Sequence, residues 1–333
     1  MNWKQPRLLI AEVGSVPDGS FGNACKLIEA AAGAGAGAVK FQTHLAEAET
    51  LRGAPSPSYF QAEPRWDYFR RTAFSAAQHK ELFRVASDCG VLFLSSPFSI
   101  EAVDLLEEVG VEAYKIPSGE ITNLPLLRRV AATGKPTLLS SGMSSWAELD
   151  RAVACLRDAA PLIPMQCSSV YPCPPERVGL NVLGLMSARY GLPVGFSDHT
   201  LGPAAVLAAA ALGAGVIEKH FAFSRLMYGS DARHSMEPAE FAQMAAALRE
   251  VWRMLESPVE KDEVAPYLEM KAIFEKSLVT VRAVPGGRPL AREDLGFKKP
   301  GTGIPSAEIE SVLGRRTRRD LPADILLRRE DLE

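Results

Sequence analysis

Short runs of apolar residues recur along the chain, and a stretch with helical periodicity follows most of them. There are eight such runs, at residues 8–14, 38–44, 91–98, 113–119, 136–142, 162–169, 193–200 and 215–222. Continuous apolar character of this length suits parallel strands that are buried on both faces. Amphipathic helices are predicted between them, for example over 76–90, 101–110, 124–134 and 145–157. Eight strands that alternate with helices favour a (β/α)8 TIM barrel over a doubly wound sheet.

Two regions depart from this alternation. Residues 45–75 hold Pro55, Pro57 and Pro64 among aromatic and charged residues, which predicts an inserted loop that serves as a lid or a substrate wall. The strand and helix pattern stops near residue 256. We therefore expect a barrel domain over 1–256, a linker over 257–276, and a small β-rich domain over 277–333. A domain of that size is marginal alone and is expected to lean on another surface.

Composition narrows the compartment and the partners. The 333 residues include 37 Lys and Arg against 40 Asp and Glu, a formal net charge of −3, which gives no electrostatic case for nucleic acid or an anionic membrane. The five cysteines are scattered and form no C-x-x-C pair, so neither a disulfide framework nor a zinc site is indicated. The first residues lack the apolar core of a signal peptide, and the alanine-rich stretch 200–217 is too short for a membrane span. We expect a cytoplasmic protein.

Three lysines lie inside apolar runs, where a buried ammonium is costly unless it is paired. Lys40 and Lys115 share the parity of the inward-facing residues, so both can face one bound anion. Serine hydroxyls at neighbouring strand ends can complete a cradle for phosphate or carboxylate: Ser96, Ser118, Ser140 and Ser197. Two alternatives stay open, namely structural salt bridges, such as Lys115 with Glu120, and a Schiff-base lysine. The third lysine that lies inside an apolar run is Lys219.

Two of the five histidines end adjacent predicted strands. His199 and His220 can therefore bind one divalent metal and leave positions open for water or substrate. The alternative is a pair of hydrogen-bonded core histidines. His79 lies on a predicted helix and is expected at the surface, whereas His44 and His234 lie in loops and receive no role.

Carboxylates also lie near the expected mouth of the barrel. Glu12, Glu120 and Asp231 can transfer protons or bind sugar hydroxyls, and the alternative is that each is an exposed loop acid. Glu218 lies two residues before His220 and can orient a ligand.

Together these segments carry a resemblance. IAEVG, VKFQTH, SSPFS, YKIPSGE, LSSGM, GFSDHTLG and EKHF occur in this order at predicted strand ends, and GSDARHSMEP follows. The set resembles the sialic acid (N-acetylneuraminate) synthase family, with its legionaminate, pseudaminate and spore-coat polysaccharide synthases. The resemblance covers nearly the whole chain, and the tail, with KKPGTGIP, resembles the family's β-clip-like SAF (antifreeze-like) domain. The family implies a transferase that condenses phosphoenolpyruvate with an N-acetylmannosamine-type hexose and releases phosphate.

The resemblance also implies roles for matching residues. Those that match the phosphoenolpyruvate site are Lys40, Ser96, Lys115, Ser118, Ser140 and Ser197. The metal ligands are His199 and His220, usually for Mn²⁺, with Mg²⁺ or Co²⁺ as alternatives. Those that match the sugar site are Glu12, Ser169, Tyr171, Asp231 and Lys299. The catalytic candidates are Glu120, Glu12 and Asp231. The family further implies a domain-swapped homodimer, in which each SAF domain covers the partner's barrel mouth.

Two departures concern the acceptor sugar. Lys299 precedes Pro300 where the sialic acid enzymes usually have Arg, and Ser169 stands where they tend to have Asn. Lysine keeps the charge but loses the bidentate fork of arginine. The alternatives are therefore the same condensation on another aldose, of the spore-coat type or phosphorylated, or a catalytically idle carbohydrate-binding SAF protein. A metal-dependent sugar isomerase is a third reading, but it would not need paired lysines.

Overall fold

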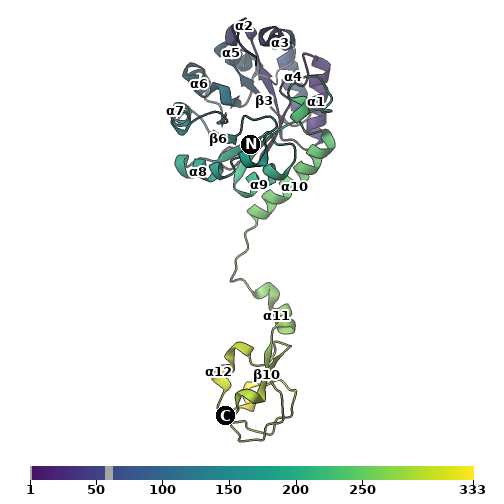
Figure 1. Ribbon diagram of the computed structural model, residues 1–333, viewed down its shortest axis with the longest axis vertical. Helices are drawn as coiled ribbons and strands as arrows, with labels where there is room; N and C mark the ends of the chain where they lie inside the picture. The colour runs from purple at the N-terminus through teal and green to yellow at the C-terminus, as the bar shows by residue number, and fades with distance from the viewer. Residues whose placement is uncertain (1, 57–62) are drawn as a thin grey trace. The chain divides into compact units, whose positions relative to one another are not determined.

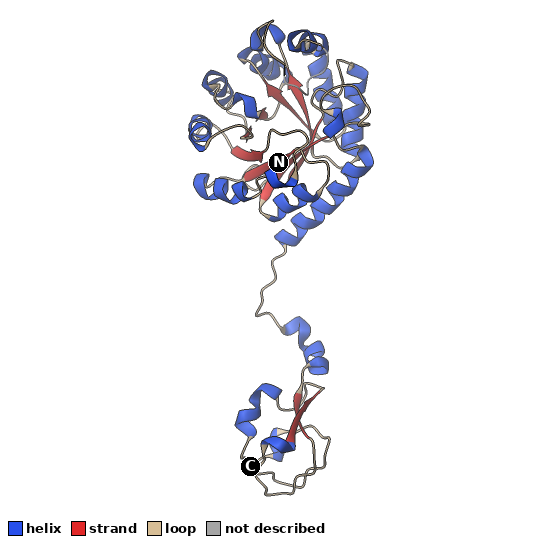
Figure 2. Ribbon diagram, in the orientation of Figure 1, coloured by secondary structure: helices blue, strands red, loops and turns tan. Residues whose placement is uncertain are grey.

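The structure is a computed structural model that describes residues 2–56 and 63–333. It divides into two compact units, Met1–Ser257 and Pro258–Glu333 (Figure 1). In the part of the chain that is described, the first unit contains a closed barrel of parallel strands, with helices packed around it (Figure 2). The strands are β1 Leu8–Glu12, β2 Ala38–Thr43, β3 Leu92–Pro97, β4 Tyr114–Ile116, β5 Thr137–Ser140, β6 Leu162–Cys167, β7 Val194–Asp198 and β8 Ala214–His220. The prediction of a TIM barrel is confirmed.

The helices of the first unit follow the strands in sequence. They are α1 Phe21–Gly33, α2 Ala46–Glu49, α3 Arg65–Thr72, α4 Ala76–Asp88, α5 Ile100–Val109, α6 Leu124–Ala131, α7 Trp146–Leu156, α8 Asn181–Tyr190, α9 Ala204–Ala211 and α10 Pro238–Glu256. Local sequence fixes several of their ends. Ser75 and Ser145 begin α4 and α7 with capping boxes, which satisfy free amide groups of the first turn. Gly110 ends α5 with φ of 89°, a conformation that glycine adopts without strain.

One correction concerns the surface of α4. His79 is only 2% exposed, although its helical position predicts a surface side chain. Its Nδ1 lies 3.1 Å from the Ser75 carbonyl oxygen, and its Nε2 lies 3.3 Å from the Thr43 hydroxyl. Thr43 also bonds Ser95 at 2.7 Å. The polar side chains on the outer face of β2 and β3 thus give the histidine buried partners.

The interval between β2 and β3 carries the predicted insertion. Helices α2 and α3 lie here, and they form a small hydrophobic cluster from Ala46, Trp66, Tyr68 and Phe69. Residues 57–62, which include Pro57, lie outside the described residues. The role of this segment as a lid or a substrate wall stays a prediction.

The second unit is small and rich in turns. It contains α11 Leu268–Phe274, α12 Ile309–Val312 and an antiparallel pair of strands, β9 Ser277–Thr280 and β10 Leu295–Lys298. The sequence Arg-Glu-Asp-Leu occurs twice, at 292–295 and 329–332. Each aspartate is buried and pairs with an arginine, Asp294 with Arg282 at 2.6 Å and Asp331 with Arg319 at 2.7 Å. Each also accepts a hydrogen bond from the backbone three residues earlier.

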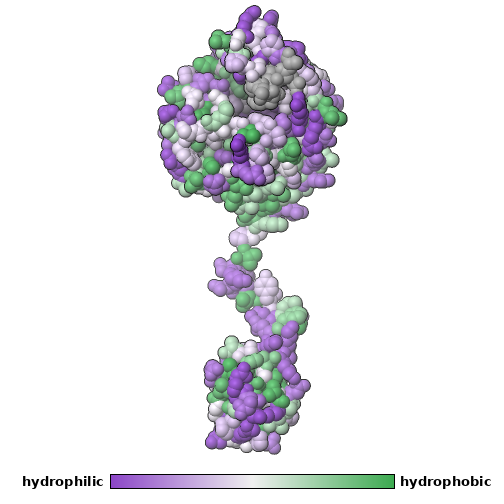
Figure 3. Space-filling model, in the orientation of Figure 1, coloured by the Kyte–Doolittle hydropathy of each residue, from purple (hydrophilic) through white to green (hydrophobic). Residues whose placement is uncertain are grey.

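The surface of the barrel unit mixes polar and apolar residues. On the face of the barrel unit visible in Figure 3, hydrophobic and hydrophilic residues are interspersed. Across the described ranges, we find no helix that is long and apolar enough to cross a membrane.

Candidate functional site

Alternate residues of each strand point into the barrel, and these inward positions form two zones. An apolar zone fills the part near the amino ends of the strands, with Trp3 packed against it. Its buried members are Leu8, Ile10, Ala38, Leu94, Ala113, Leu138, Ile163, Met165 and Val216. Further along the strands the same parity carries buried polar groups: Glu12, Lys40, Ser96, Lys115, Ser140, Ser197, Glu218 and His220. We call this second zone the polar layer. It lies at the carboxyl ends of the strands, where TIM barrels place their chemistry.

The first ion pair of the polar layer joins β1 and β2. Lys40 Nζ lies 2.7 Å from Glu12 Oε2 and 3.2 Å from the Ser96 hydroxyl. Gln42 Nε2 donates to Glu12 Oε1 at 2.8 Å. Burial raises the pKa of Glu12 to about 7, although the Lys40 ammonium opposes this shift. Glu12 therefore gains or loses a proton near neutral pH.

The second ion pair crosses the barrel from β4 to β8. Lys115 Nζ donates to both carboxylate oxygens of Glu218 at 2.9 Å, and the Ser197 hydroxyl donates to Oε1 at 3.0 Å. Burial alone would raise the pKa of Glu218, but Lys115 and Lys40 lower it to about 2. The partner of Lys115 is thus Glu218 rather than Glu120, the partner suggested by closeness in sequence.

The two lysines converge as their parity predicts. Lys40 Nζ lies 4.0 Å from the same Glu218 oxygen that bonds Lys115. Burial works against the ammonium form of Lys40, but the carboxylates of Glu12 and Glu218 outweigh it and raise its pKa. Two cations therefore lie around one carboxylate, and an anionic ligand can contact both of them.

Hydroxyl groups surround this centre. Ser140 Oγ is buried and has no hydrogen-bond partner among the described residues. Ser118 Oγ accepts a hydrogen bond from the Gly142 backbone N–H at 2.9 Å. A side chain at Gly142 would place its Cβ only 2.8 Å from Ser118 Oγ and 2.4 Å from Ser169 Oγ. Glycine at 142 therefore lets the two hydroxyls approach one loop.

The two histidines at the ends of β7 and β8 lie close together, with ring centroids 5.5 Å apart. His199 Nδ1 donates to the Ser168 carbonyl oxygen at 2.7 Å, so Nε2 is the nitrogen that a metal would take when the ring is neutral. Burial opposes the charged form of His199, but Cys167 and the Ser168 carbonyl outweigh it and raise the pKa of this histidine. His220 Nδ1 is buried and has no partner in the described part of the chain, and burial lowers the pKa of His220 to about 3. The Tyr171 ring lies 4.1 Å from His199.

A neutral imidazole with a free nitrogen is the form that binds a divalent metal. The two histidines therefore fit such an ion. Over the described ranges, no group of three or more His, Cys, Asp and Glu could hold a metal. With His199 and His220 as its protein ligands, a bound ion would keep positions open for water or substrate.

The remaining carboxylates are held at the mouth. Asp231 Oδ2 accepts hydrogen bonds from the Ser15 backbone N–H at 2.9 Å and the Ser15 hydroxyl at 2.7 Å. Glu120 accepts from the Asn123 amide at 2.8 Å, and burial raises the pKa of Glu120. Lys299 belongs to the second unit, where its ammonium lies over the Phe274 ring at 4.7 Å.

Some residues at this end of the barrel carry no assignment from the sequence. Gln42 contacts Glu12, and His44 contacts Gln42. The strand period could have identified Gln42, because it lies two residues after Lys40 and shares its inward parity. Ser15 and Glu49 lie in loops or short helices, where no period marks them.

The outer face of β7 and β8 holds a separate buried pair. Lys219 is fully buried and lies 2.6 Å from Asp198 Oδ2. It also donates to the backbone carbonyls of Thr200 and Gly202. The ammonium therefore has a carboxylate and two carbonyls as partners, which is a structural arrangement.

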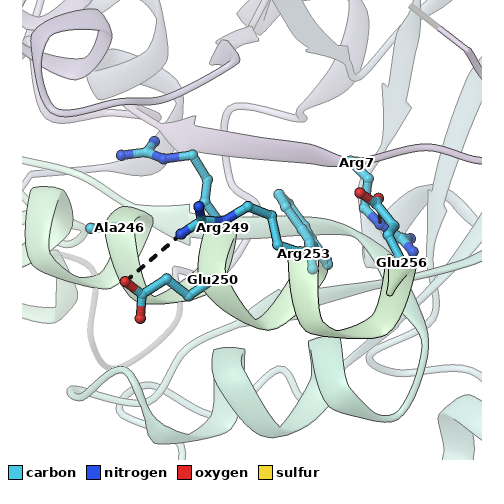
Figure 4. A pocket seen from close by; sticks show the side chains of 7 residues that line it. Arg7, Ala246, Arg249, Glu250, Arg253 and Glu256 are labelled. Carbon is cyan, nitrogen blue, oxygen red and sulfur yellow. Dashed lines mark hydrogen bonds and ion pairs between the residues drawn. The ribbon is translucent and has the colours of Figure 1, made fainter. Parts of the chain in front are cut away.

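A pocket of about 540 Å³ lies elsewhere on the barrel unit. Arg7, Arg249, Trp252 and Arg253 line it with Glu250 and Glu256, mostly from one side of α10 (Figure 4). Arg7 directly precedes β1, so this pocket lies toward the amino ends of the strands. It lies away from the polar layer, and we assign it no chemistry.

Comparison with known proteins agrees with the motifs. The NeuB family model matches residues 27–260, more than half of the chain, and a SAF domain matches 275–333. The chain is 36% identical to the N,N'-diacetyllegionaminic acid synthase of Campylobacter jejuni, over 96% of this chain and 98% of that one. It is 33% identical to the human N-acetylneuraminate-9-phosphate synthase, over 94% and 89%.

A solved structure of a sialic acid synthetase is also similar to this chain. The sialic acid synthetase of Leptospira borgpetersenii superposes with a TM-score of 0.71 at 29% identity, over 80% of this chain and 90% of that one. The resemblance inferred from the motifs is confirmed. The chain therefore belongs to the NeuB family of sialic acid synthases and carries a C-terminal SAF domain.

Proposed function

We propose that this chain condenses phosphoenolpyruvate with an N-acetylmannosamine-type hexose, forming a nine-carbon 2-keto-3-deoxy acid and releasing phosphate. One observation carries the proposal most directly, namely the convergence of Lys40 and Lys115 on one point of the polar layer. Two buried cations at the carboxyl ends of barrel strands suit a small, strongly anionic substrate. Membership in the NeuB family supports the same reaction class.

The lysines are paired with carboxylates in the structure, so an incoming anion meets a nearly neutral site. Glu12, whose pKa is raised to about 7, can offset the added negative charge by taking up a proton. A neutral Glu12 leaves the charge of Lys40 for the ligand. Hydroxyl groups supply further donors to the phosphate and the carboxylate: Ser96, Ser118, Ser140 and Ser197.

A divalent metal bound by His199 and His220, Mn²⁺ or else Mg²⁺ or Co²⁺, would polarise the aldehyde oxygen of the sugar. The hydrogen bond from His199 to the Ser168 carbonyl fixes the ring that would hold it. Glu12, Ser169, Tyr171 and Asp231 would contact the sugar.

The bond changes then follow from the substrates. C3 of phosphoenolpyruvate attacks the aldehyde carbon, the former aldehyde oxygen takes a proton, and positive charge develops at C2. Water adds to C2, and the C–O bond to phosphate breaks to leave the keto group. We assign to Glu120, which accepts a hydrogen bond from Asn123, the role of taking the proton of that water or of steadying the charge at C2.

We further propose a cytoplasmic, domain-swapped homodimer, in which Lys299 of one chain approaches the sugar of the other. Apolar side chains on loops after three strands support a covering surface at the mouth. Met143 is 65% exposed, Leu201 51% and Leu226 95%. Excluding water in this way would limit hydrolysis and strengthen each polar contact.

Phosphate release tests the reaction. Phosphoenolpyruvate and Mn²⁺ are supplied with a panel of hexosamines, hexoses and phosphorylated aldoses, and inorganic phosphate is measured. We expect release with an N-acylated hexosamine. Absence of release with every sugar, after EDTA treatment and restoration of metal, would contradict the proposal.

The same panel tests a second candidate, the same condensation on another aldose. Ser169 and Lys299 favour it, because both depart from the residues common in the sialic acid enzymes. Turnover that is confined to a neutral or phosphorylated aldose would establish it. Binding of sugars without any turnover would instead indicate the idle carbohydrate-binding protein.

Lys299→Ala tests the shared site. We expect the KM for the sugar to rise about 10-fold, because one charged contact is lost, with little change in the KM for phosphoenolpyruvate. Lys298→Ala is the matched control, since Lys298 pairs with Asp324 in its own unit. An effect confined to phosphoenolpyruvate would contradict the covering model.

A further inference from the structure

His44 has no role in the proposed reaction, yet its surroundings are unusually specific. Its imidazole ring lies between two phenylalanines, with the Phe69 centroid at 3.8 Å and an interplanar angle of 6°, and the Phe98 centroid at 4.0 Å and 20°. The ring is therefore stacked on both faces. Such a sandwich fixes its plane and leaves only the ring edge for polar contacts.

Both nitrogens on that edge face oxygen atoms. Nδ1 lies 2.8 Å from Glu49 Oε1, and Nε2 lies 3.1 Å from the Gln42 side-chain oxygen. The orientation of the Gln42 amide follows from its other contact, because its nitrogen donates to Glu12 Oε1 at 2.8 Å. With Glu12 ionised, the amide oxygen points at His44, where it accepts a hydrogen bond.

The hydrogen-bond partners of His44 determine how many protons its ring carries. The carboxylate of Glu49 and the amide oxygen of Gln42 are both acceptors, so both ring nitrogens must donate. An imidazole with two N–H groups carries a positive charge. Two aromatic faces at about 4 Å are a favourable environment for a cation, and the Glu49 carboxylate supplies the opposite charge.

The contacts form one continuous chain through the site. It runs from Glu49 through His44 and Gln42 to Glu12, and from Glu12 to Lys40 at 2.7 Å. We call this series the His44 relay. It connects the segment after β2 with the centre of the polar layer.

The contacts of His44 leave no polar atom of its ring for a substrate. Both ring nitrogens already face protein oxygens, and both ring faces are covered by phenylalanines. A small cavity borders His44 and Gln42, with Ser15 and Tyr68 also in its lining. His44 therefore acts through its neighbours.

We propose that His44, as an imidazolium held between Phe69 and Phe98, is a positioning residue that fixes the Gln42 amide and thereby the carboxyl group of Glu12. The inference rests on the proposed function, because it assigns Glu12 to the acceptor sugar. With the imidazolium in place, the Gln42 nitrogen always faces Glu12. Without it the amide can rotate and present its oxygen, which repels the carboxylate.

The first test does not depend on activity. The full chain is labelled with ¹⁵N-histidine, and the His44 signal is identified by its loss in His44→Gln. We expect both ring nitrogens of His44 to carry protons at pH 7. A single protonated nitrogen would overturn the proposal, whatever reaction the protein catalyses.

The second test uses steady-state kinetics with phosphoenolpyruvate and the accepted sugar. His44→Gln should lower kcat/KM for the sugar about 10- to 100-fold, the effect of losing a charged hydrogen bond. The KM for phosphoenolpyruvate should change little. His79→Gln is the matched control, because it removes a buried histidine bonded to Thr43, the residue next to His44, and should lower stability without changing either KM.

Phe98→Leu removes one face of the sandwich and leaves every hydrogen-bonding group in place. We expect it to reduce kcat/KM for the sugar in the same direction but by less than His44→Gln. Equal losses for His44→Gln and His79→Gln would show a general packing effect and overturn the proposal. If the wild-type protein releases no phosphate with any sugar, the proposed function fails, and the NMR result still decides the state of His44.

Discussion

The inner and outer faces of β7 and β8 carry similar residues with different consequences. On the outer face, Lys219 has Asp198 and two backbone carbonyls as partners and is sealed from solvent. On the inner face, Glu218 pairs with Lys115 and lies 4.0 Å from Lys40, beside polar atoms that have no partner among the described residues. Because successive strand residues alternate in direction, the adjacent residues Glu218 and Lys219 belong to two separate ion pairs, one in the polar layer and one outside the barrel.

The strongest test of this difference is on the inner face. His220→Ala should lose metal-dependent turnover by at least about 1,000-fold, because it removes one of the two proposed metal ligands. The side chain points into the polar layer, so the fold should survive, as judged by circular dichroism and thermal unfolding. Activity that persists unchanged would mean that His220 is a core histidine.

The outer face should respond through stability. Lys219→Met leaves Asp198 buried and unpaired, which we expect to lower the free energy of unfolding by about 3–5 kcal/mol. Urea denaturation measures this loss, and the KM for phosphoenolpyruvate should stay unchanged. Combining Lys219→Met with Asp198→Leu should recover much of the stability, since it removes the unpaired charge.

Lys115→Met is the counterpart of that variant on the inner face. It also removes the closest cation from a buried carboxylate, Glu218, but it should raise the KM for phosphoenolpyruvate as well. If Lys219→Met changed this KM and Lys115→Met did not, the division between the two faces would be wrong.

The smallest expected effect concerns pH. The native pKa of Glu12 is raised from 4.5 to about 7, so between these values the folded state binds more protons than the unfolded state. The contribution of Glu12 to stability is therefore complete below pH 4.5 and is lost as the pH rises to 7, by up to about 3 kcal/mol. Denaturation at a series of pH values measures the slope.

Glu12→Gln should remove this slope, because the amide does not titrate. Glu81→Gln, a change of a half-buried residue on α4, should keep it. A wild-type protein whose stability rises steadily from pH 4.5 to 7, and does so equally in Glu12→Gln, would show that Glu12 is ionised throughout.

The sequence predicts the barrel well because each strand can be recognised from residues that are close together in the chain. Each strand is a continuous apolar run, and the parity of Lys40 and Lys115 within their runs places both of them inward. The partner of Lys115 could not be predicted from local sequence. Glu218 lies 103 residues away and contacts Lys115 only because β8 closes the barrel. The prediction that His79 is exposed is wrong for a similar reason. The sequence of its own helix does not show that Thr43 and Ser95 provide polar groups beneath it.

The His44 relay lies further from what a sequence pattern can show. Gln42 follows from strand parity, but the stacking of His44 needs Phe69 from α3 and Phe98 from the loop after β3. No periodicity relates these positions. Only the arrangement of three separate segments turns an unremarked loop histidine into a candidate cation.

The apolar zone near the amino ends of the strands has one more consequence. Leu8, Ile10 and Ile163, with Trp3 against them, make that end of the barrel a closed floor. Under the proposed reaction, both substrates, the keto acid and the released phosphate must all use the opposite opening. Any segment that comes to cover this opening therefore controls departure as well as entry, and its opening can limit the rate of the whole cycle.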